Sequence, residues 1–313
     1  LRAFGLRRPP PKQFMSLLVV GTTALDSIKT PYAENPRLLG GSASHAAVAA
    51  SFFAPTHLVG AVGEDFPRKY INLYRRHGLC LEGLDQLPGQ TFHWSGEYEV
   101  NMNNRRTLDT VLGVIENYSP TLPAAYTRLP YVLLANIAPD LQGHVLDQMK
   151  RPKFIVADTM DLWLNIARPA VLKLLKRIDC LVLNDSEAAQ LVEEDNVVAA
   201  LPRIHKLGPK YVIVQTGEHG ATLPGPKGLF VAPAYPLKKV VDPTGAGDSF
   251  VGGLMGYLAS QKGSLDKNLR AAIIHGTVTA SYCCEDFGLK KTTKVKKTDI
   301  SRRVRELTKM VSW

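Results

Sequence analysis

The sequence predicts an α/β fold in which a mostly parallel sheet is covered by helices on both faces. Six short apolar runs rich in β-branched residues recur along the chain, and helical patterns separate them. Because these runs are continuously apolar rather than alternating, each suits a strand that is buried on both faces. Strands that alternate with helices imply right-handed crossovers between parallel neighbours. The predicted strands are Leu17–Val20, His57–Gly60, Tyr131–Ala135, Phe154–Ala157, Cys180–Leu183 and Tyr211–Gln215.

The helical patterns lie between these strands and at the end of the chain. Residues 298–311 carry Ile300, Val304, Leu307 and Val311 at helical spacing, which predicts an amphipathic helix with its arginines facing solvent. The other predicted helices are Ser42–Phe53, Pro67–His77, Pro169–Arg177, Glu187–Glu194 and Val197–Leu207.

Two segments depart from the alternation of strands and helices. Residues 90–115 interleave polar and aromatic side chains, as antiparallel strands do, and residues 22–39 are expected to add strands to the same small sheet. A small sheet beside an α/β core is typical of a lid over a ligand cleft. We expect residues 15–313 to form one domain. Residues 1–14, which contain three consecutive prolines, are expected to be a basic tail outside the fold.

Composition excludes several classes of protein. The chain is 45% hydrophobic and 21% charged, as in soluble globular proteins, and no apolar run approaches the roughly 18–20 residues that span a bilayer. Its four cysteines show neither metal-ligand spacing nor the density of a disulfide scaffold. We therefore expect a cytoplasmic protein without a membrane partner. Organellar import of a longer precursor is the alternative, because residues 1–14 are rich in arginine.

The net charge of +10 is concentrated at the two ends of the chain. Residues 1–14 contribute +4 and residues 290–313 contribute +7, which leaves −1 for the rest. Basic termini are more often solvated than functional, so the sequence gives little support for nucleic-acid binding. Counterion release at these ends leaves contact with a polyanion as an open alternative.

Polar residues follow four of the predicted strands. Asn136, Asp158, Asn184 and Thr216 lie at or just after the carboxyl ends of these runs. In open α/β sheets the ligand binds outside the carboxyl ends of the strands, so the four residues predict one shared cleft. The alternative for each of them is that it caps a turn or the following helix.

Residues 242–248 have the sequence Asp-Pro-Thr-Gly-Ala-Gly-Asp and precede a helical pattern from Ser249 to about Ser260. Small residues let backbone amides turn inward together, and a helix N-terminus favours an anion. A carboxylate at this point, Asp248, is either a helix cap or a base that accepts a proton from an attacking hydroxyl. The three small residues before it favour the base. No Gly-Lys-Ser/Thr follows, so this is not a P-loop.

With its flanking motifs, this loop resembles the C-terminal signature of the PfkB, or ribokinase-like, carbohydrate kinases. Segment Gly40–Ala47 resembles the double-glycine motif of the family, and Gly60–Phe66 resembles the segment that follows it. Asn184–Glu187 fits an Asn-x-x-Glu motif, and Gln215–Gly220 resembles the nucleotide-side glycine turn. The resemblance covers most of residues 15–290. It implies a ribokinase-like three-layer α/β/α core with a mostly parallel sheet plus a small β-sheet lid.

The resemblance also implies a chemistry and its cofactors. Asp248 would be the general base, and the amides of Gly245, Ala246 and Gly247 would form an anion hole for the γ-phosphate of ATP. The remaining implied residues are Asn184 and Glu187 for Mg²⁺ through water, Asn184, Thr216, Gly217 and Gly220 for the nucleotide, and Asp242 for a monovalent cation, K⁺, as in some members.

The acceptor would be bound by Asp26, Gly40 and Gly41. His45 stands where the family has asparagine, and this departure leaves the identity of the acceptor open. The implied function is ATP-dependent phosphorylation of a hydroxyl on a sugar or sugar-like molecule. A nucleoside kinase of the same fold is one alternative, and a catalytically degenerate relative that binds ligands is another. A homodimer through the lid is compatible with the 90–115 segment.

Overall fold

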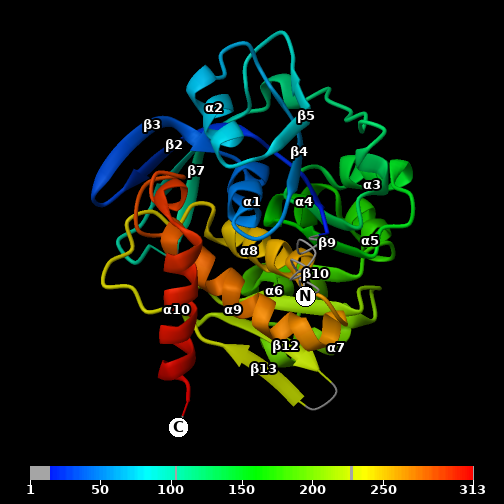
Figure 1. Cartoon of the computed structure of the whole chain (residues 1–313), viewed down its shortest axis with the longest axis vertical. Helices are drawn as coiled ribbons and strands as arrows, with labels where there is room; N and C mark the ends of the chain where they lie inside the picture. Colours follow the sequence, from blue (N-terminus) through cyan, green and yellow to red (C-terminus); the bar gives the residue numbers. More distant parts are fainter. Residues whose placement is uncertain (1–14, 103, 226–227, 313) are drawn as a thin grey trace, which may run out of the picture.

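The computed structural model describes residues 15–102, 104–225 and 228–312. The expected basic tail, residues 1–14, lies outside the described residues. A large sheet is sandwiched between two layers of helices, and a small sheet projects from one side of this core (Figure 1). The ribokinase-like α/β fold with its small lid sheet, predicted from the sequence, is thereby confirmed.

The large sheet has nine strands, and its parallel part contains all six strands that the sequence predicts. Their order across the sheet is β13-β12-β11-β10-β9-β8-β1-β4-β5, and the pairs from β11 to β5 are parallel. The chain reverses its direction of winding at β1, which lies between β4 and β8. The strands are β1 (Leu17–Val20), β4 (Thr56–Val62), β5 (Cys80–Gln86), β8 (Tyr131–Leu134), β9 (Phe154–Asp158), β10 (Cys180–Asn184), β11 (Tyr211–Gln215), β12 (Ala221–Gly225) and β13 (Gly228–Ala232).

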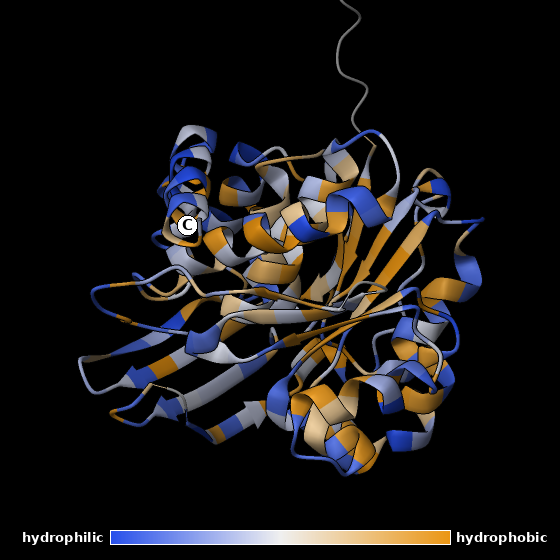
Figure 2. Ribbon diagram, turned by 90° about the horizontal axis from the view of Figure 1, so that it is seen from below, coloured by the Kyte–Doolittle hydropathy of each residue, from blue (hydrophilic) through white to orange (hydrophobic). Residues whose placement is uncertain are grey.

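Each helical layer packs on one face of this sheet. In β1, Leu17 and Val19 belong to one hydrophobic cluster, and Leu18 and Val20 belong to the other. Continuous apolarity in the strand therefore follows from burial on both faces. Figure 2 shows the strands as a hydrophobic layer with helices above and below. The α-helices are α1 (Ser42–Ser51), α2 (Arg68–Arg76), α3 (Pro139–Gln148), α4 (Asp161–Ile166), α5 (Arg168–Leu175), α6 (Asp185–Val192), α7 (Val197–His205), α8 (Ala246–Ser260), α9 (Leu265–Cys283) and α10 (Lys297–Met310).

The small sheet is built from the two segments that the sequence assigns to a lid. Its order is β3-β2-β6-β7, with β2 (Ala24–Thr30), β3 (Ala33–Gly40), β6 (His93–Tyr98) and β7 (Arg105–Val111). β2 and β6 pair in parallel, although the other neighbours are antiparallel. The strands begin and end next to the large sheet, so the lid lies over the carboxyl ends of the central strands.

The sequence did not predict β5, the β12–β13 hairpin or the helices α3, α4 and α9. β5 is an edge strand whose side chains are mostly exposed or half-buried, so it lacks the apolar run that identifies the central strands. The hairpin contains Pro224 and Gly225, which disfavour a strand. Among the described residues, no helix combines the length and apolarity needed to cross a bilayer.

The helix α10 differs from the expectation in one side chain. Arg303 is 9% exposed rather than solvated, and its guanidinium donates to Ser281 Oγ at 2.8 Å and to the carboxylate of Glu285. It also lies over the Tyr282 ring at 3.7 Å. This buried pair holds α10 on α9. The apolar spacing finds the buried face of the helix but cannot identify an arginine within it.

Glycines bring α8 into backbone contact with α1. A Cβ atom on Gly252 would lie 2.2 Å from the Ala46 carbonyl oxygen, and one on Gly256 would lie 2.5 Å from that of Ala50. Only hydrogen fits at these two positions. The contact holds the N-terminus of α8 against the N-terminal half of α1.

We expect Gly252→Ala to destabilise the protein by about 1–3 kcal/mol, because the added methyl must push two helix backbones apart. Denaturant unfolding measures the change. Gly143→Ala in α3 is the matched control. Its nearest neighbour would be Arg177 Nη1 at 3.6 Å, so the substitution should be neutral or stabilising by up to about 1 kcal/mol. Equal effects of the two substitutions would contradict the close contact.

Candidate active site

A cavity of about 240 Å³ opens at the carboxyl ends of the central strands, beneath the lid. Thr22 follows β1, Asn136 follows β8, Asp158 ends β9 and Asn184 ends β10, and all four line it. The cavity therefore lies at the point where the strand order reverses, as expected for a ligand site in a doubly wound sheet. Three of the four strand-end residues predicted to share a cleft are brought together here.

Most of the predicted site residues meet at this cavity. Those that line it are Asp26, Gly41, His45, Asn184, Glu187, Gly245, Gly247 and Asp248. Those that do not line it are Gly40, Thr216, Gly217, Gly220, Asp242 and Ala246.

The loop before α8 presents free amides to the cavity. Gly245 is the N-cap of α8 with φ +78°, so the helix begins three residues earlier than the sequence predicts and Asp248 lies in its first turn. The Ala246 amide donates to the Pro243 carbonyl at 3.1 Å. Within the described part of the chain, the amides of Gly245 and Gly247 have no backbone or side-chain acceptor. Two free amides at a helix N-terminus suit an anion.

His45 supports this loop from behind. A Cβ atom on Gly245 would lie 2.4 Å from the imidazole, so the glycine packs flat against the ring. His45 Nδ1 is 3.6 Å from the Cys283 sulfur, and Nε2 is buried without a partner among the described residues. Burial lowers the pKa of His45 to about 4, so the ring is neutral at physiological pH. A neutral ring with one unused nitrogen can donate or accept a hydrogen bond.

Asp248 faces the cavity from the first turn of α8. Burial raises the pKa of its carboxyl to about 6, and the charge of Arg105 on the lid opposes that rise. A carboxylate with a pKa near 6 is deprotonated at neutral pH, yet is a stronger base than an exposed aspartate. Its place beside two free amides fits a base better than a helix cap alone.

Asp26 also lines the cavity, from the lid strand β2. Its Oδ2 accepts from the Gly41 amide at 3.3 Å, and Oδ1 has no partner among the described residues. Burial raises the pKa of Asp26 to about 7. A Cβ atom on Gly40 would lie 1.9 Å from Oδ2, so the double glycine is required for the carboxylate to sit here. An unused buried carboxylate oxygen can accept a hydrogen bond from a hydroxyl.

Asn184 and Glu187 form a capping box at the start of α6. Asn184 Oδ1 accepts from the Glu187 amide at 2.8 Å, and Glu187 Oε2 accepts from the Asn184 amide at 2.9 Å. The capping alternative is therefore confirmed for Asn184. They also line the cavity, and burial raises the pKa of Glu187 to about 7. Capping fixes the two side chains at the edge of the cavity and leaves Glu187 Oε1 free to face it.

A third carboxylate, Asp158, lies near Glu187 and Asp248. Burial raises the pKa of Asp158, and the charges of Asp248 and Glu187 raise it further. In the described part of the chain, no three His, Cys, Asp or Glu side chains are close enough to hold a metal ion by themselves. The donors fit Mg²⁺ that keeps most of its water and is bound through one or two carboxylates and phosphate oxygens.

The turn that the sequence assigns to the nucleotide lies just outside the cavity. Thr216 donates its amide to the Gly220 carbonyl at 2.8 Å and closes the turn between β11 and β12. Gly217 and Gly220 both have positive φ, +53° and +101°. The preceding residue, Gln215, lines the cavity instead. A nucleotide bound at the turn would therefore extend beyond this cavity.

Asp242 is fully buried and ties two loops together. Its Oδ1 accepts from the Thr244 amide and its Oδ2 from the Gly288 amide, each at 2.9 Å. These bonds fix the start of the 242–248 loop against the segment after α9. Coordination of a monovalent cation by Asp242 stays a prediction.

Lid residues complete the site, and sequence reasoning missed the most important of them. Phe92, Trp94, Tyr98 and Arg105 all line the cavity. The sequence did not identify Tyr98 and Arg105 as site residues. The Thr244 hydroxyl donates to the Tyr98 hydroxyl at 3.1 Å, which connects the lid to the loop before α8. Side chains alternate between the two faces of β6 and β7, but the sequence does not give the register of these strands, so no sequence signal identifies the two residues.

A second chamber of about 940 Å³ adjoins the first beneath the lid. Trp94, Arg105 and Asn136 belong to both chambers. Leu112, Ile115, Leu141, Leu162 and Trp163 line this chamber but not the first one. The space beneath the lid is thus larger than the cavity next to Asp248.

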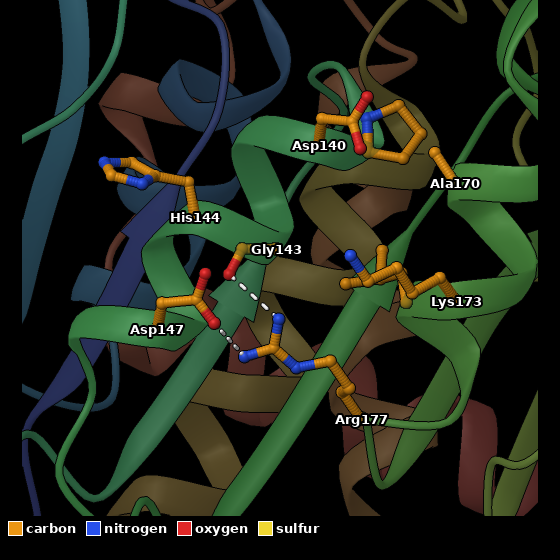
Figure 3. Close-up of a pocket in the computed structure, with 9 residues that line it drawn as sticks. Asp140, Gly143, His144, Asp147, Ala170, Lys173 and Arg177 are labelled. Carbon is orange, nitrogen blue, oxygen red and sulfur yellow. Dashed lines mark hydrogen bonds and ion pairs between the residues drawn. The ribbon is translucent and has the colours of Figure 1, made fainter.

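A separate hollow of about 100 Å³ lies between α3 and α5 (Figure 3). Arg177 crosses its floor and donates to the Gly143 carbonyl at 3.2 Å and to Asp147 at 2.7 Å. None of the predicted site residues lines it. The hydrogen bonds join two surface helices, so this hollow is assigned no chemistry.

A helix N-terminus with free amides, a buried base and a set of carboxylates suited to hydrated Mg²⁺ define a phosphotransferase with an alcohol group as acceptor. The model of the pfkB family carbohydrate kinases matches residues 25–295. The chain belongs to this family and is a kinase of sugars or nucleosides.

Individual relatives agree with this assignment. The chain is 28% identical to a cytidine kinase from Thermococcus kodakarensis over 78% of its own length and 88% of that protein. Its fold matches the nucleoside kinase of Methanocaldococcus jannaschii with a TM-score of 0.75 at 18% identity, over 93% of this chain and 98% of that one. It matches Arabidopsis thaliana ribokinase, solved with ribose and ATP, with a TM-score of 0.74 at 20% identity, over 93% and 99%.

We expect Asp248→Asn to stabilise the ligand-free protein at pH 8. Because the folded-state pKa of Asp248, about 6, is above the unfolded value of 3.8, folding at pH 8 carries the cost of a buried charge. That cost is absent below about pH 4, grows as pH rises from about 4 to about 6, and is fully present above pH 6. The substitution should add about 1–3 kcal/mol at pH 8 and much less at pH 4.5. Denaturant unfolding measures both.

The exposed Asp195→Asn is the charge-matched control and should change stability at neither pH. Loss of stability in Asp248→Asn at pH 8 would contradict a destabilising buried charge.

Proposed function

We propose that the protein transfers the γ-phosphoryl group of ATP to a hydroxyl of a sugar or sugar-like small molecule, with Asp248 as general base. The observation that carries the proposal is the position of Asp248 in the first turn of α8, next to the free amides of Gly245 and Gly247. Asp26 lines the same cavity, where it can hold the acceptor. Base, anion site and acceptor site thus lie in one enclosed space.

In the proposed reaction the acceptor oxygen attacks the γ-phosphorus while Asp248 takes the hydroxyl proton. The bond from the γ-phosphorus to the bridging oxygen breaks, and ADP leaves. The amides of Gly245 and Gly247 donate to the oxygens of the transferring group, where negative charge is concentrated. The Ala246 amide, bonded to Pro243, orders the turn. Mg²⁺ bound near Glu187, Asn184 and Asp158 would neutralise phosphate charge.

The nucleotide is proposed to lie along the turn of Thr216, Gly217 and Gly220, with Asn184 at its phosphates. This turn is next to Gln215, which lines the cavity, so the phosphates can enter from that side. K⁺ at Asp242 would act on the same loop from outside the cavity. Asp242 is buried there and already orders Thr244.

The second chamber favours a nucleoside as the acceptor over a free monosaccharide. A ribosyl group fits the 240 Å³ next to Asp248, and the apolar side chains that line only the second chamber suit a flat, partly apolar substituent on it. Trp163 Nε1 donates to Asn136 Oδ1 at 2.7 Å and fixes the boundary of the two chambers. A free sugar would leave the larger chamber empty.

Other predictions from the sequence keep the status of proposals. The edge strand β7 exposes Leu108 and Val111, which supports a homodimer through the lid. A catalytically degenerate relative is disfavoured by the retained base. Cytoplasmic location remains the expectation, and the basic ends are the only basis for contact with nucleic acid.

Asp248→Asn should lower kcat by at least about 100-fold while MgATP still binds, because only the proton acceptor is lost. In the wild type, kcat/KM should fall about tenfold per pH unit below pH 6, since a base with a pKa of about 6 is protonated there. A coupled assay of ADP release measures the rates, and calorimetry measures ATP binding. Unchanged turnover in the variant would sink the mechanism.

A panel of pentoses, hexoses and nucleosides with MgATP should give the highest kcat/KM with a nucleoside. Leu162→Trp, which narrows the second chamber, should lower kcat/KM for that nucleoside by about tenfold or more and leave D-ribose within about twofold. Leu229→Trp, on the outer hairpin, is the control. If free sugars have the highest kcat/KM and Leu162→Trp has no effect, the acceptor is a monosaccharide and not a nucleoside.

A further inference from the structure

Arg105 reaches the site from the lid. It is the first residue of β7 and pairs with Tyr98 of β6, so both side chains lie on the same face of the small sheet. Tyr98 is 7% exposed and bonded to the Thr244 hydroxyl. Arg105 is thereby aimed at the N-terminus of α8, and it lines both chambers.

The charge around Arg105 is unbalanced. Asp26, Asp158, Glu187 and Asp248 face the first chamber, and of the described residues that line it Arg105 is the only lysine or arginine. Its charge counters the burial that raises the pKa of Asp248 and of Glu187, so the guanidinium is within electrostatic reach of both. Even so, no carboxylate in the described part of the chain lies within ion-pair distance of it.

The neighbouring residue shows what an ordinary lid arginine does here. Arg106 points to the other side of β7, where it donates to Glu97 at 2.7 Å with 74% of its side chain exposed. The two arginines are one residue apart on opposite faces of β7: Arg106 is paired with Glu97, and Arg105 lines the cavity without a carboxylate partner among the described residues. The Arg105 guanidinium hydrogen-bonds the Tyr98 hydroxyl but no carboxylate in the described part of the chain, so most of its five donors are available for an incoming anion.

We propose that Arg105 binds the phosphoryl group during its transfer, from the side opposite the Gly245 and Gly247 amides. This rests on the proposed function. The planar guanidinium matches two oxygens of a phosphoryl group, and the charge of that group is spread over its three equatorial oxygens in the transition state. Because Arg105 is carried by the lid, its positive charge is placed next to the phosphoryl group only when the Tyr98–Thr244 hydrogen bond holds the lid on the loop before α8.

The alternative is that Arg105 only neutralises the resting carboxylates. In that case, loss of Arg105 would change the stability of the protein and the pKa values of the carboxylates. It would change the affinity for nucleotides with and without a γ-phosphoryl group equally. Binding of two nucleotides therefore separates the two roles.

The test compares Arg105→Ala, Arg105→Lys and the matched control Arg106→Ala with the wild type. With MgATP and the best acceptor of a ribose–cytidine panel, Arg105→Ala should lower kcat by about 100-fold or more and raise KM for ATP by less than about tenfold. Added guanidinium chloride should restore part of the rate. Arg105→Lys should be intermediate, because the fork is lost but the charge remains. Arg106→Ala should match the wild type.

The second arm needs no acceptor. In calorimetry, Arg105→Ala should bind MgAMPPNP about 3- to 10-fold more weakly than the wild type and MgADP equally well. Equal losses for both nucleotides, or rates like those of Arg106→Ala, would overturn the proposal. If the wild type phosphorylates no acceptor, the proposed function fails, but the nucleotide comparison still decides whether Arg105 binds the γ-phosphoryl group.

Discussion

The backbone contact between α1 and α8 is the constraint on which the site depends. Because Gly252 and Gly256 carry no side chain, α8 rests directly on the carbonyls of Ala46 and Ala50. This brings the free amides at the start of α8 next to His45 in the first turn of α1, and the residues just before α1 hold Asp26 through the double glycine. The free amides at the start of α8 and the Asp26 carboxylate thus lie at the same end of one helix–helix contact.

The second organising feature is buried negative charge. Burial raises the pKa values of Asp26, Glu187 and Asp248 to between about 6 and 7. An empty site therefore holds carboxylates that would be more stable in water, and a cation relieves that cost. The protein itself supplies Arg105 from the lid, and a bound metal would supply the rest. The site therefore favours ligands that bind together with a cation.

The sequence predicted those parts of the fold that have a distinctive local pattern of residues. The six central strands are apolar on both faces, and Asp248 follows a run of small residues, so both were found. Strand ends also identified Asn136, Asp158 and Asn184 as neighbours. The prediction that Thr216 lines the shared cleft is wrong, because Gln215, one residue earlier, lines it instead. Arg105 could not be predicted, since its direction depends on the register of β7 against β6, and the edge strand β5 has no apolar run at all.

His45 contacts the loop before α8 and also lines the cavity. Its ring packs against Gly245, and its Nε2 is buried without a hydrogen-bond partner among the described residues. A smaller residue such as asparagine would change the hydrogen bond offered to the acceptor and would also leave a gap under the anion loop and beside Cys283. A substitution at position 45 therefore acts on the loop before α8 and on the cavity at the same time, so the two cannot be changed independently through this residue.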